Sequence, residues 1–451
     1  MTPTPDTIAA PATPSGTAAI ALLRISGPDT GNIARALTGG LPGPRQAQRA
    51  DYRDLAGRLV DDVLLTFFRG PASYTGEDTL EISCHGNPYI VQRIFEDLLQ
   101  RGCRAAGPGE FTQRAFLNGR MDLSQAEAVM DLIHARGERA LQAANQQLRG
   151  ALGRKMSGLI EGLLGSLARI EAYIDFPDED LPPEDRKLLD SELSRLQQET
   201  QKLLTTSHYG NILRDGLKVV ILGQPNVGKS SLLNRLVGHD RALVSAEPGT
   251  TRDYLEERIL LGDHCLRLID TAGLNLTPAP IEQLGIEKSM ERLQEADLVL
   301  LVLDASVPPP RFADGVRQNL TPANTLVVLN KADLPPAPSS ASAFAEFESV
   351  ATSATTGVGL ETLSAALSRR AAAFHVELGE DLIAINARHA DALGRAQASL
   401  IRAIEQLEAN DPTELIAHEL REVLAAYGEI AGKIDNERML DHLFATFCIG
   451  K

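Results

Sequence analysis

The feature that most constrains this chain is the run LKVVILGQPNVGKS at residues 217–230, an apolar strand that leads directly into a glycine-containing loop. In such a loop, Gly223 and Gly228 let successive backbone N–H groups turn inward around phosphate oxygens, and the following helix adds its positive end. Lys229 is placed to reach the β- and γ-phosphates, and Ser230 to offer its hydroxyl to magnesium. The run therefore predicts the phosphate-binding loop of a nucleoside triphosphatase.

Three further motifs follow in the order expected for a guanine-nucleotide site. DTAG at residues 270–273 ends a strand-like stretch, where the aspartate can order magnesium through water and the glycine can turn its N–H toward a γ-phosphate. NKAD at residues 330–333 follows the buried-strand run TLVVLN, and Asp333 can accept from the ring N–H and exocyclic amine of guanine. Residues 353–354, Ser-Ala, are placed to back the guanine. Together these motifs predict a GTP-binding domain.

The catalytic residues are less clear from the motifs. GTTRD at residues 249–253 places Thr251 as a switch over magnesium and γ-phosphate. Ras-like GTPases use a glutamine after the DTAG-type motif to orient the attacking water, and here that position is Leu274. Asn226 has a side-chain oxygen that could ligate a monovalent cation. Glu282 is either the residue that orients the water at a distance or a solvated surface carboxylate.

Composition limits the class of protein. A chain of 451 residues predicts two or three domains. Its four scattered cysteines and its N-terminal segment, which lacks a basic region before an apolar core, predict a reduced cytoplasmic protein without a signal peptide. No apolar run approaches the length of a membrane span. The net charge of −16 argues against broad non-specific nucleic-acid binding but permits a local basic face.

Periodicity predicts a multidomain chain that combines α/β and all-α parts. Residues 1–118 mix short β-like runs with a helix over 88–101, and residues 119–214 have a helical period. Residues 215–373 read as a Ras-like P-loop domain, a mostly parallel sheet with helices on both faces. Helical periodicity returns in residues 374–451. We expect the two helical parts to form one discontinuous domain into which the P-loop domain is inserted.

Within the first helical part, local signals mark where helices start and stop. Ser124 and Glu127 have the spacing of a capping box and predict a helix start there. The acidic, proline-containing stretch at residues 175–185 predicts a loop. A polar helix is expected to follow it to about residue 209.

These motifs carry a resemblance over essentially the whole chain. The order DTIAAPATPSG, RISG, GEFTQRAFLNGRMDLSQAEAVMDLI, GQPNVGKSSLLN, DTAGL, LGIEKS, NKAD and terminal FCIGK resembles the MnmE (TrmE) family of tRNA modification GTPases. The motifs at both ends of the chain are specific to that family. The resemblance implies an N-terminal tetrahydrofolate-binding domain, a helical domain and an inserted G domain, in a homodimer formed through the N-terminal domains.

The resemblance also implies a reaction and its participants. The partner would be an FAD-dependent MnmG-type protein in a heterotetramer, and the substrate would be the wobble uridine of certain tRNAs. The product would carry carboxymethylaminomethyl or aminomethyl at carbon 5, with one carbon from 5,10-methylene- or 5-formyl-tetrahydrofolate. GTP, magnesium and potassium would be required, with no membrane involvement.

Residue roles transfer by the same resemblance. Glu282 would orient the water, Ser230 and Thr251 would hold magnesium, and potassium would be held by Asn226, Ser245, Glu247 and Thr250. The predicted GTP contacts are Asn226, Val227, Gly228, Lys229, Ser230, Ser231, Ser245, Ala246, Glu247, Pro248, Gly249, Thr250, Thr251, Asp270, Thr271, Ala272, Gly273, Asn330, Lys331, Asp333, Ser353 and Ala354.

The implied folate site combines a carboxylate for the pterin ring with cations for the glutamate tail. Its residues would be Arg24, Glu81, Arg120 and Lys451, with Arg120 at a position where the family commonly has lysine. Cys448 would be a buried thiol or a participant near this chemistry rather than a prenylation site. The alternative function is an Era- or EngA-like switch in ribosome assembly, although the RNA-binding domain that such proteins carry after the GTPase is not apparent here.

Overall fold

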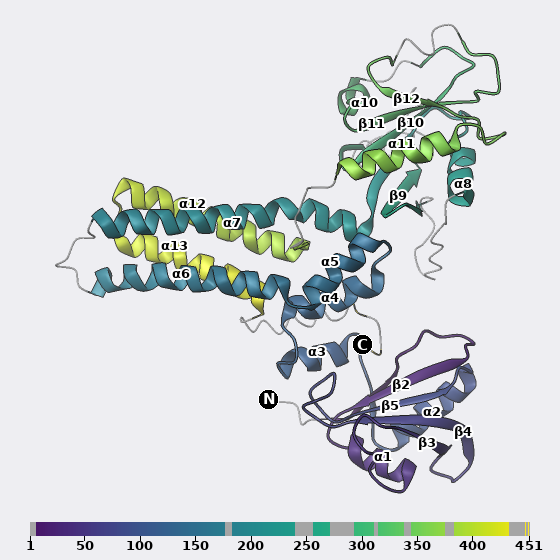
Figure 1. Cartoon of the computed structure of the whole chain (residues 1–451), viewed down its shortest axis with the longest axis vertical. Helices are drawn as coiled ribbons and strands as arrows, with labels where there is room; N and C mark the ends of the chain where they lie inside the picture. The colour runs from purple at the N-terminus through teal and green to yellow at the C-terminus, as the bar shows by residue number, and fades with distance from the viewer. Residues whose placement is uncertain are drawn as a thin grey trace, which may run out of the picture. The chain divides into compact units, whose positions relative to one another are not determined.

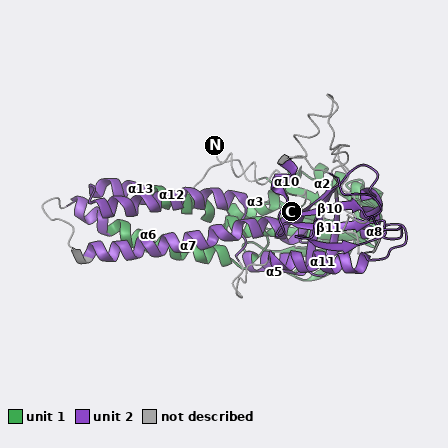
Figure 2. Cartoon of the chain, turned by 90° about the horizontal axis from the view of Figure 1, so that it is seen from above, with its two compact units in different colours: residues 1–130, 148–168, 421–451 green, residues 131–147, 169–420 purple. Residues whose placement is uncertain are grey.

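The computed structural model (Figure 1) describes residues 6–175, 183–239, 256–270, 293–310, 314–337, 344–374, 383–432, 447 and 450. Two compact units are distinguished in Figure 2. Unit 1 comprises Met1–Met130, Leu148–Ala168 and Arg421–Lys451, and unit 2 comprises Asp131–Gln147 and Arg169–Leu420.

Unit 1 contains a six-stranded sheet in the order β3-β4-β5-β2-β1-β6. Its neighbouring strands are antiparallel except that β6 runs parallel to β1. The strands are β1 (Ile8–Pro11), β2 (Ile20–Ser26), β3 (Ala47–Arg53), β4 (Leu59–Phe68), β5 (Thr79–His85) and β6 (Arg104–Ala105). Burial alternates along β2 and β4, which places Leu23, Ile25, Leu65 and Phe67 in one core. This alternation is typical of an antiparallel sheet with one face packed.

Two helices contribute to that core. They are α1 (Thr30–Thr38) and α2 (Pro88–Gln100), and Ile94 and Leu98 of α2 are fully buried. Helix α2 starts where the Asn87 side chain accepts a hydrogen bond from the Tyr89 N–H and Pro88 fills the first turn. The helix predicted over residues 88–101 is therefore confirmed.

The predicted capping box in the first helical segment is wrong by two residues. Helices α3 (Glu110–Leu117) and α4 (Leu123–His134) follow the sheet, and Ser124 and Glu127 are buried inside α4. The box is formed instead by Asp122, whose carboxylate accepts from the Gln125 N–H at 2.8 Å, while the Gln125 side chain accepts from the Asp122 N–H at 2.9 Å. An aspartate–glutamine pair offers the same reciprocal bonds as a serine–glutamate pair.

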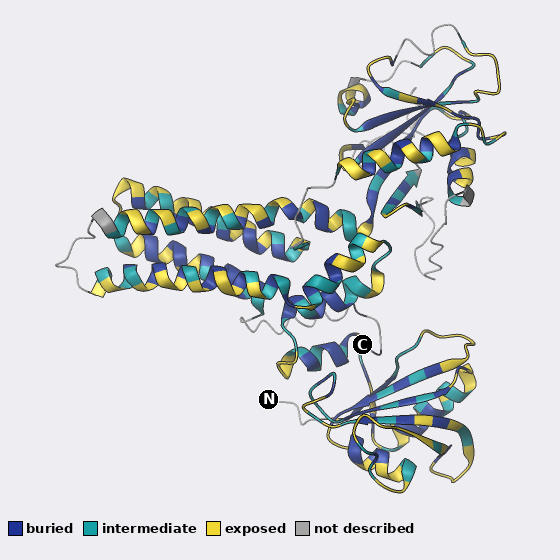
Figure 3. Ribbon diagram, in the orientation of Figure 1, coloured by how far each residue is buried: buried dark blue, intermediate teal, exposed yellow. Residues whose placement is uncertain are grey.

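Long helices make up most of the remaining helical residues. They are α5 (Glu138–Leu148), α6 (Ala151–Asp175), α7 (Pro183–Asp215), α12 (Ala387–Ala409) and α13 (Thr413–Ala431). Helix α7 extends beyond the predicted end near residue 209 and stops before Gly216, whose φ of +89° suits a helix C-terminus. Within unit 2, α12 packs along α7. The buried residues of α12 include Ala396, Leu400 and Ala403, and Figure 3 colours both helices by burial.

Unit 2 also contains a second six-stranded sheet, in the order β12-β11-β10-β7-β9-β8. All neighbouring strands are parallel except β8, which is antiparallel to β9. The elements are β7 (Leu217–Leu222), α8 (Lys229–His239), β8 (Glu256–Leu261), β9 (His264–Asp270), β10 (Leu298–Asp304), α10 (Asp314–Asn319), β11 (Thr325–Asn330), β12 (Glu348–Ala351) and α11 (Leu360–Ala373). The predicted fold class is therefore confirmed.

This second sheet is buried on both faces. One hydrophobic cluster joins alternate strand residues such as Val219 and Leu300 to α8 and α11, and another joins Val299 and Leu301 to Val316 of α10. Continuous apolar strands are typical of a parallel sheet covered on both sides. The polar groups of this sheet are consequently concentrated beyond the strand ends.

Among the described residues, no helix is both long and apolar enough to cross a membrane.

Candidate functional site

The phosphate loop lies where β7 ends and α8 begins, at the carboxyl edge of the parallel sheet. Its glycines are required by close packing. A Cβ atom on Gly223 would lie 2.4 Å from the carbonyl oxygen of Val302, and one on Gly228 would lie 2.4 Å from Nδ2 of Asn330. Gly228 also has a φ of +94°, which L side chains rarely adopt. Glycine is therefore the residue that lets this loop approach its neighbours and present its backbone.

Lys229 closes this loop from the inside. Its side chain is buried, and Nζ donates to the carbonyl oxygens of Gly223 at 2.8 Å and Gln224 at 2.9 Å. Asn226, at a φ of +65°, and Ser230 are exposed at the rim of the loop. A helix N-terminus with a lysine held across such a loop is suited to bind phosphate.

Asn330 joins three parts of the predicted nucleotide site. The residue ends β11 and is fully buried. Its Nδ2 donates to the carbonyl oxygen of Val227 at 2.8 Å, and its Oδ1 accepts from the N–H of Ala354 at 3.0 Å. The structure thus brings together the predicted residues of the phosphate loop, NKAD and the Ser353-Ala354 loop.

The neighbouring Lys331 is held by a carboxylate that the motifs did not single out. Its Nζ lies 2.6 Å from Oδ2 of Asp304, at the end of β10. Burial raises the pKa of Asp304, but hydrogen bonds from Lys331 and Ser306 outweigh it and hold that pKa below the usual carboxyl value. The signal available in the sequence was position, because Asp304 ends a wholly apolar strand at the same sheet edge.

The base side of the predicted site consists of Asp333 and the loop after β12. Asp333 is exposed and accessible to a base. Ser353 is buried, and its N–H donates to the carbonyl oxygen of Val358. Its hydroxyl accepts from the Thr356 N–H and its carbonyl oxygen from the Gly357 N–H, so the loop is fixed as a tight turn. A second residue that the motifs did not single out, Arg235 of α8, donates to carbonyl oxygens of this loop.

Several predicted residues lie outside the described part of the chain. Asp270 ends β9 opposite Ile221 of β7, so its backbone is at the phosphate-loop edge. The predicted residues that the structure does not describe are Ser245, Ala246, Glu247, Pro248, Gly249, Thr250, Thr251, Thr271, Ala272, Gly273, Glu282 and Lys451, together with Cys448.

A second predicted site, in unit 1, is built from side chains across strands. Arg24 on β2 stands directly opposite Glu81 on β5, and its Nη2 and Nε lie 2.8 and 3.1 Å from the same carboxylate oxygen. The side chains are only 16% and 25% exposed. The guanidinium also lies over the rings of Tyr74 and Phe111, 5.2 and 5.8 Å from their centroids. A cation, a carboxylate and two aromatic rings therefore share one place.

Arg120 lies against the same turn, and Gly450, the residue before Lys451, lies against the neighbouring strand. A Cβ on Gly76 would lie 3.3 Å from Cγ of Arg120, so the exposed Arg120 packs its stem on the turn that carries Tyr74. Gly450, at a φ of +94°, would place a Cβ 2.2 Å from the carbonyl oxygen of Pro11 at the end of β1. The residue before Lys451 therefore lies against the strand next to Arg24.

The described cysteines carry no activated thiol. Burial raises the pKa of the Cys84 and Cys103 thiols to about 11, and it also raises the pKa of Cys265. All three are free thiols. They are protonated at neutral pH, and Cys84 and Cys103 behave as small buried hydrophobic side chains.

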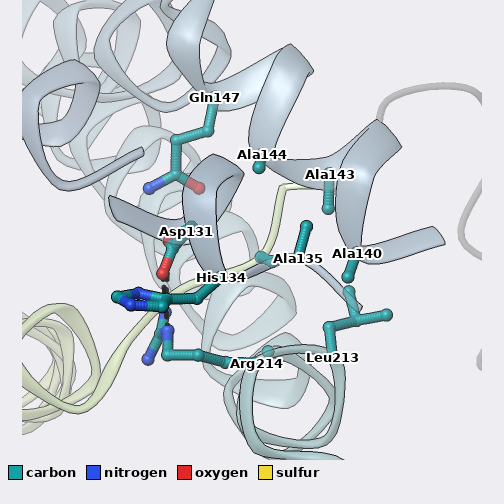
Figure 4. A pocket seen from close by; sticks show the side chains of 11 residues that line it. Asp131, His134, Ala135, Ala140, Ala143, Ala144, Gln147, Leu213 and Arg214 are labelled. Atoms are coloured by element: carbon teal, nitrogen blue, oxygen red, sulfur yellow. Dashed lines mark hydrogen bonds and ion pairs between the residues drawn. The ribbon is translucent and has the colours of Figure 1, made fainter. Parts of the chain in front are cut away.

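A separate cavity in unit 2 is shown in Figure 4. The ends of α4 and α7 supply its polar wall, where Nε of Arg214 lies 2.7 Å from Oδ1 of Asp131, and α5 supplies alanines. None of the described residues that line it belongs to the predicted nucleotide or folate motifs. The cavity is therefore distinct from both candidate sites.

Comparison with known proteins identifies the family. The family model of the MnmE helical domain matches residues 123–448, and that of the GTP-binding protein TrmE N-terminus matches residues 7–120. The tRNA modification GTPase MnmE of Opitutus terrae is 58% identical over 452 residues, covering 100% of both chains. Its counterpart from Akkermansia muciniphila is 46% identical over 457 residues, again covering 100% of both chains.

Among solved structures, the G domain of the T. maritima FeoB iron transporter matches with 27% identity and a TM-score of 0.27. This match covers 34% of the present chain and 98% of the FeoB G-domain chain. The family assignment rests instead on the full-length matches and the two family models, which confirm the resemblance inferred from the motifs. The chain belongs to the family of the tRNA modification GTPase MnmE.

Proposed function

We propose that the chain binds and hydrolyses GTP at the carboxyl edge of the parallel sheet in unit 2. The observation that carries this proposal is Asn330, which ties the phosphate loop at Val227 to the loop at Ala354. The loop proposed to bind phosphate and the loop proposed to back the base are thereby held in a fixed relative position. The glycine cradle and the buried Lys229 fit a triphosphate, and the exposed Asp333 fits the N–H edge of guanine.

Two cations and one carboxylate would complete the hydrolytic site. Ser230 and Thr251 would hold magnesium, which would supply positive charge to offset that of the phosphates. Asn226, Ser245, Glu247 and Thr250 would hold potassium, which would supply positive charge where other GTPases use an arginine finger. Glu282 would orient the attacking water in place of the missing glutamine, since Leu274 has no polar group.

The GTPase would serve tRNA modification, the role that the names of the full-length relatives state for those proteins. Together with an FAD-dependent MnmG-type partner, the chain would add carboxymethylaminomethyl or aminomethyl to carbon 5 of the wobble uridine. Arg24, Glu81, Arg120 and Lys451 would hold the tetrahydrofolate that supplies one carbon. The Arg24–Glu81 pair over Tyr74 and Phe111 fits a pterin ring with an anionic tail.

We further propose a domain organisation in a homodimer. Residues 1–118 would bind folate and dimerise, residues 119–214 and 374–451 would form the helical domain, and residues 215–373 would form the G domain. Helix α7 ends at Asp215 and β7 starts at Leu217, which supports the first junction of the G domain. A cytoplasmic location fits a tRNA substrate. The full-length match favours this role over a ribosome-assembly switch.

Wobble-uridine analysis tests the proposed role directly. A strain that lacks this gene should contain tRNAs without the carbon-5 group, as measured by mass spectrometry of tRNA nucleosides. The wild-type gene should restore the group, and a Lys229→Ala gene should not, because Lys229 closes the phosphate loop. Intact modification in the deletion strain would contradict the proposal.

GTP hydrolysis in potassium chloride and in sodium chloride tests the proposed ion. The rate should be higher in potassium, and Asn226→Ala should remove the difference because the amide oxygen is lost. Equal wild-type rates in the two salts would exclude the potassium site while leaving GTP hydrolysis itself in place.

A further inference from the structure

Helix α3 of unit 1 holds the turn that carries Tyr74, which comprises residues 74–77. The hydroxyl oxygens of Tyr74 and Thr112 lie 2.9 Å apart. The Asn118 side chain donates to the carbonyl oxygen of Thr75 at 2.7 Å. Thr112 lies within α3 and Asn118 is its C-cap residue, so one helix binds two successive residues of the turn.

Arg114 of α3 fixes the far end of the same turn. Its Nη1 donates to Oε2 and Oε1 of Glu77 at 3.2 and 3.3 Å, and Ser26 Oγ donates to the same Oε2 at 2.8 Å. Ser26 lies on β2 two residues after Arg24, and strand residues two apart share one face of a sheet. The Glu77 carboxylate therefore fastens the turn both to α3 and to the strand that carries Arg24.

The Arg114 side chain is enclosed by carboxylates and only 12% exposed. Besides Glu77, it pairs with Glu110 at 3.0 Å and with Asp6. Burial lowers the pKa of Arg114, but these carboxylates outweigh burial and hold that pKa above its usual value. Removing the guanidinium would leave a half-buried Glu77 without its cation, and this is costly for the local structure.

We infer that Arg114 is a positioning residue for folate binding, because it fixes the turn that places the Tyr74 ring against Arg24. This inference rests on the proposed folate site. Cζ of Arg24 lies 5.2 Å from the centroid of the Tyr74 ring and 5.8 Å from that of Phe111, which belongs to α3. Both rings that orient this guanidinium therefore depend on α3 for their position.

The test measures binding of 5-formyl-tetrahydrofolate to the full chain by isothermal titration. In Arg114→Ala we expect the affinity to fall about tenfold, because Arg24 loses a fixed aromatic ring beside it. Arg114→Lys should recover only part of the affinity, since an ammonium group cannot reproduce the planar fork of a guanidinium. GTP hydrolysis should remain at the wild-type rate in both variants.

Arg101 supplies a matched control in the same unit. Its side chain is 11% exposed, and its Nε lies 2.6 Å from Oδ2 of Asp97, which also accepts from the Tyr52 hydroxyl at 2.7 Å. This is again a buried arginine, a carboxylate and a tyrosine. Tyr52, however, packs in the core with Leu23, on the face of the sheet opposite to Arg24.

Thermal unfolding and a second background separate positioning from stability. Arg101→Ala and Arg114→Ala should each lower the melting temperature, but only Arg114→Ala should lower folate affinity. When Tyr74 is already replaced by alanine, Arg114→Ala should still lower the melting temperature. Its further effect on folate affinity should then be less than about twofold, because the ring that it positions is gone.

The outcomes separate this inference from the proposed function. Unchanged folate affinity in Arg114→Ala, an equal loss in Arg101→Ala, or an equal loss with and without Tyr74 would overturn the positioning role while the folate site stands. Failure of the wild-type chain to bind 5-formyl-tetrahydrofolate would instead remove the proposed site itself. If Arg114→Ala does not fold, Glu77→Gln takes its place, since it removes the same ion pair and keeps the side-chain shape. The same loss of affinity is expected, and wild-type affinity would overturn the inference.

Discussion

The two six-stranded sheets of this chain build their candidate sites by opposite means. The sheet in unit 2 is parallel and buried on both faces, so its polar groups gather beyond the carboxyl ends of β7, β10, β11 and β12. The sheet in unit 1 is mostly antiparallel, and its candidate site is a cross-strand pair, Arg24 with Glu81. Sheet topology therefore determines whether the polar groups of a candidate site lie beyond the strand ends or on the strands themselves.

This difference also decides which atoms do the recognition. In the parallel sheet the phosphate loop presents backbone groups, and the glycines are needed because neighbouring atoms approach to 2.4 Å of a Cβ position. In the antiparallel sheet the candidate recognition groups are side chains on half-buried strand positions. A backbone site should fail when a methyl group is added, whereas a side-chain site should fail when a charge is removed.

Gly228→Ala should have the largest effect, because it adds a methyl group at a crowded position of the phosphate loop that also has a positive φ. The new Cβ would meet Asn330 Nδ2, which is fixed by its own hydrogen bonds, at a φ of +94°. Strain of about 1–3 kcal/mol together with the lost loop geometry should weaken GDP binding by at least roughly 100-fold. Equilibrium binding of a fluorescent GDP analogue measures this.

Gly39→Ala is the control for backbone strain alone. Gly39 also has a positive φ, +73°, but an added Cβ would meet no atom within 4 Å. It lies after α1 in unit 1 and should leave GDP affinity unchanged. Wild-type affinity in Gly228→Ala would show that the phosphate loop can move aside, and the contrast between the two sheets would weaken.

Glu81→Gln should have an intermediate effect confined to the other sheet. The substitution keeps the shape of the side chain but removes the charge that faces Arg24. Loss of a charge-assisted hydrogen bond of about 1.5–3 kcal/mol should weaken tetrahydrofolate binding roughly tenfold or more, with GTP hydrolysis unchanged. Isothermal titration with 5-formyl-tetrahydrofolate and a GTPase assay on one preparation measure both.

The Arg49–Asp62 pair is the matched control for this substitution. It also joins neighbouring strands of the same sheet, but its side chains are 77% and 42% exposed. Asp62→Asn should therefore change neither folate binding nor hydrolysis. An equal loss of folate affinity in both variants would mean that the sheet, rather than the Arg24–Glu81 pair, forms the site.

The same contrast explains what could be predicted from sequence. The phosphate loop and NKAD could be predicted because a backbone site requires fixed residue types at short spacing, and residues 226–230 and 330–333 are contiguous. Arg24 and Glu81 could be named only through family resemblance, because a cross-strand pair leaves no local pattern. The contacts of Asp304 and Arg235 were not predicted for the same reason, since their partners are distant along the chain. The misplaced capping box at Ser124 arose because two overlapping polar pairs satisfied one spacing rule.

Asp304→Asn should have the smallest effect, because the Asp304 carboxylate acts on the candidate nucleotide site only through its ion pair with Lys331. The ion pair with Lys331 is partly exposed, so its loss should cost about 0.5–1 kcal/mol near pH 7. The pKa of Asp304 is lowered in the folded chain, so the stabilisation is complete above the unfolded carboxyl pKa of about 3.9 and is lost as the pH falls through the folded value. Hydrogen exchange of the Ala332 and Leu334 amides, which bond Thr352 and Lys331, reports this locally. Exchange in the variant should exceed that in the wild type from pH 7 to about pH 4 and converge with it at lower pH. A difference that grows as the pH falls would show that Asp304 is stabilised in its protonated form, and the backbone would then not be the main support of this site.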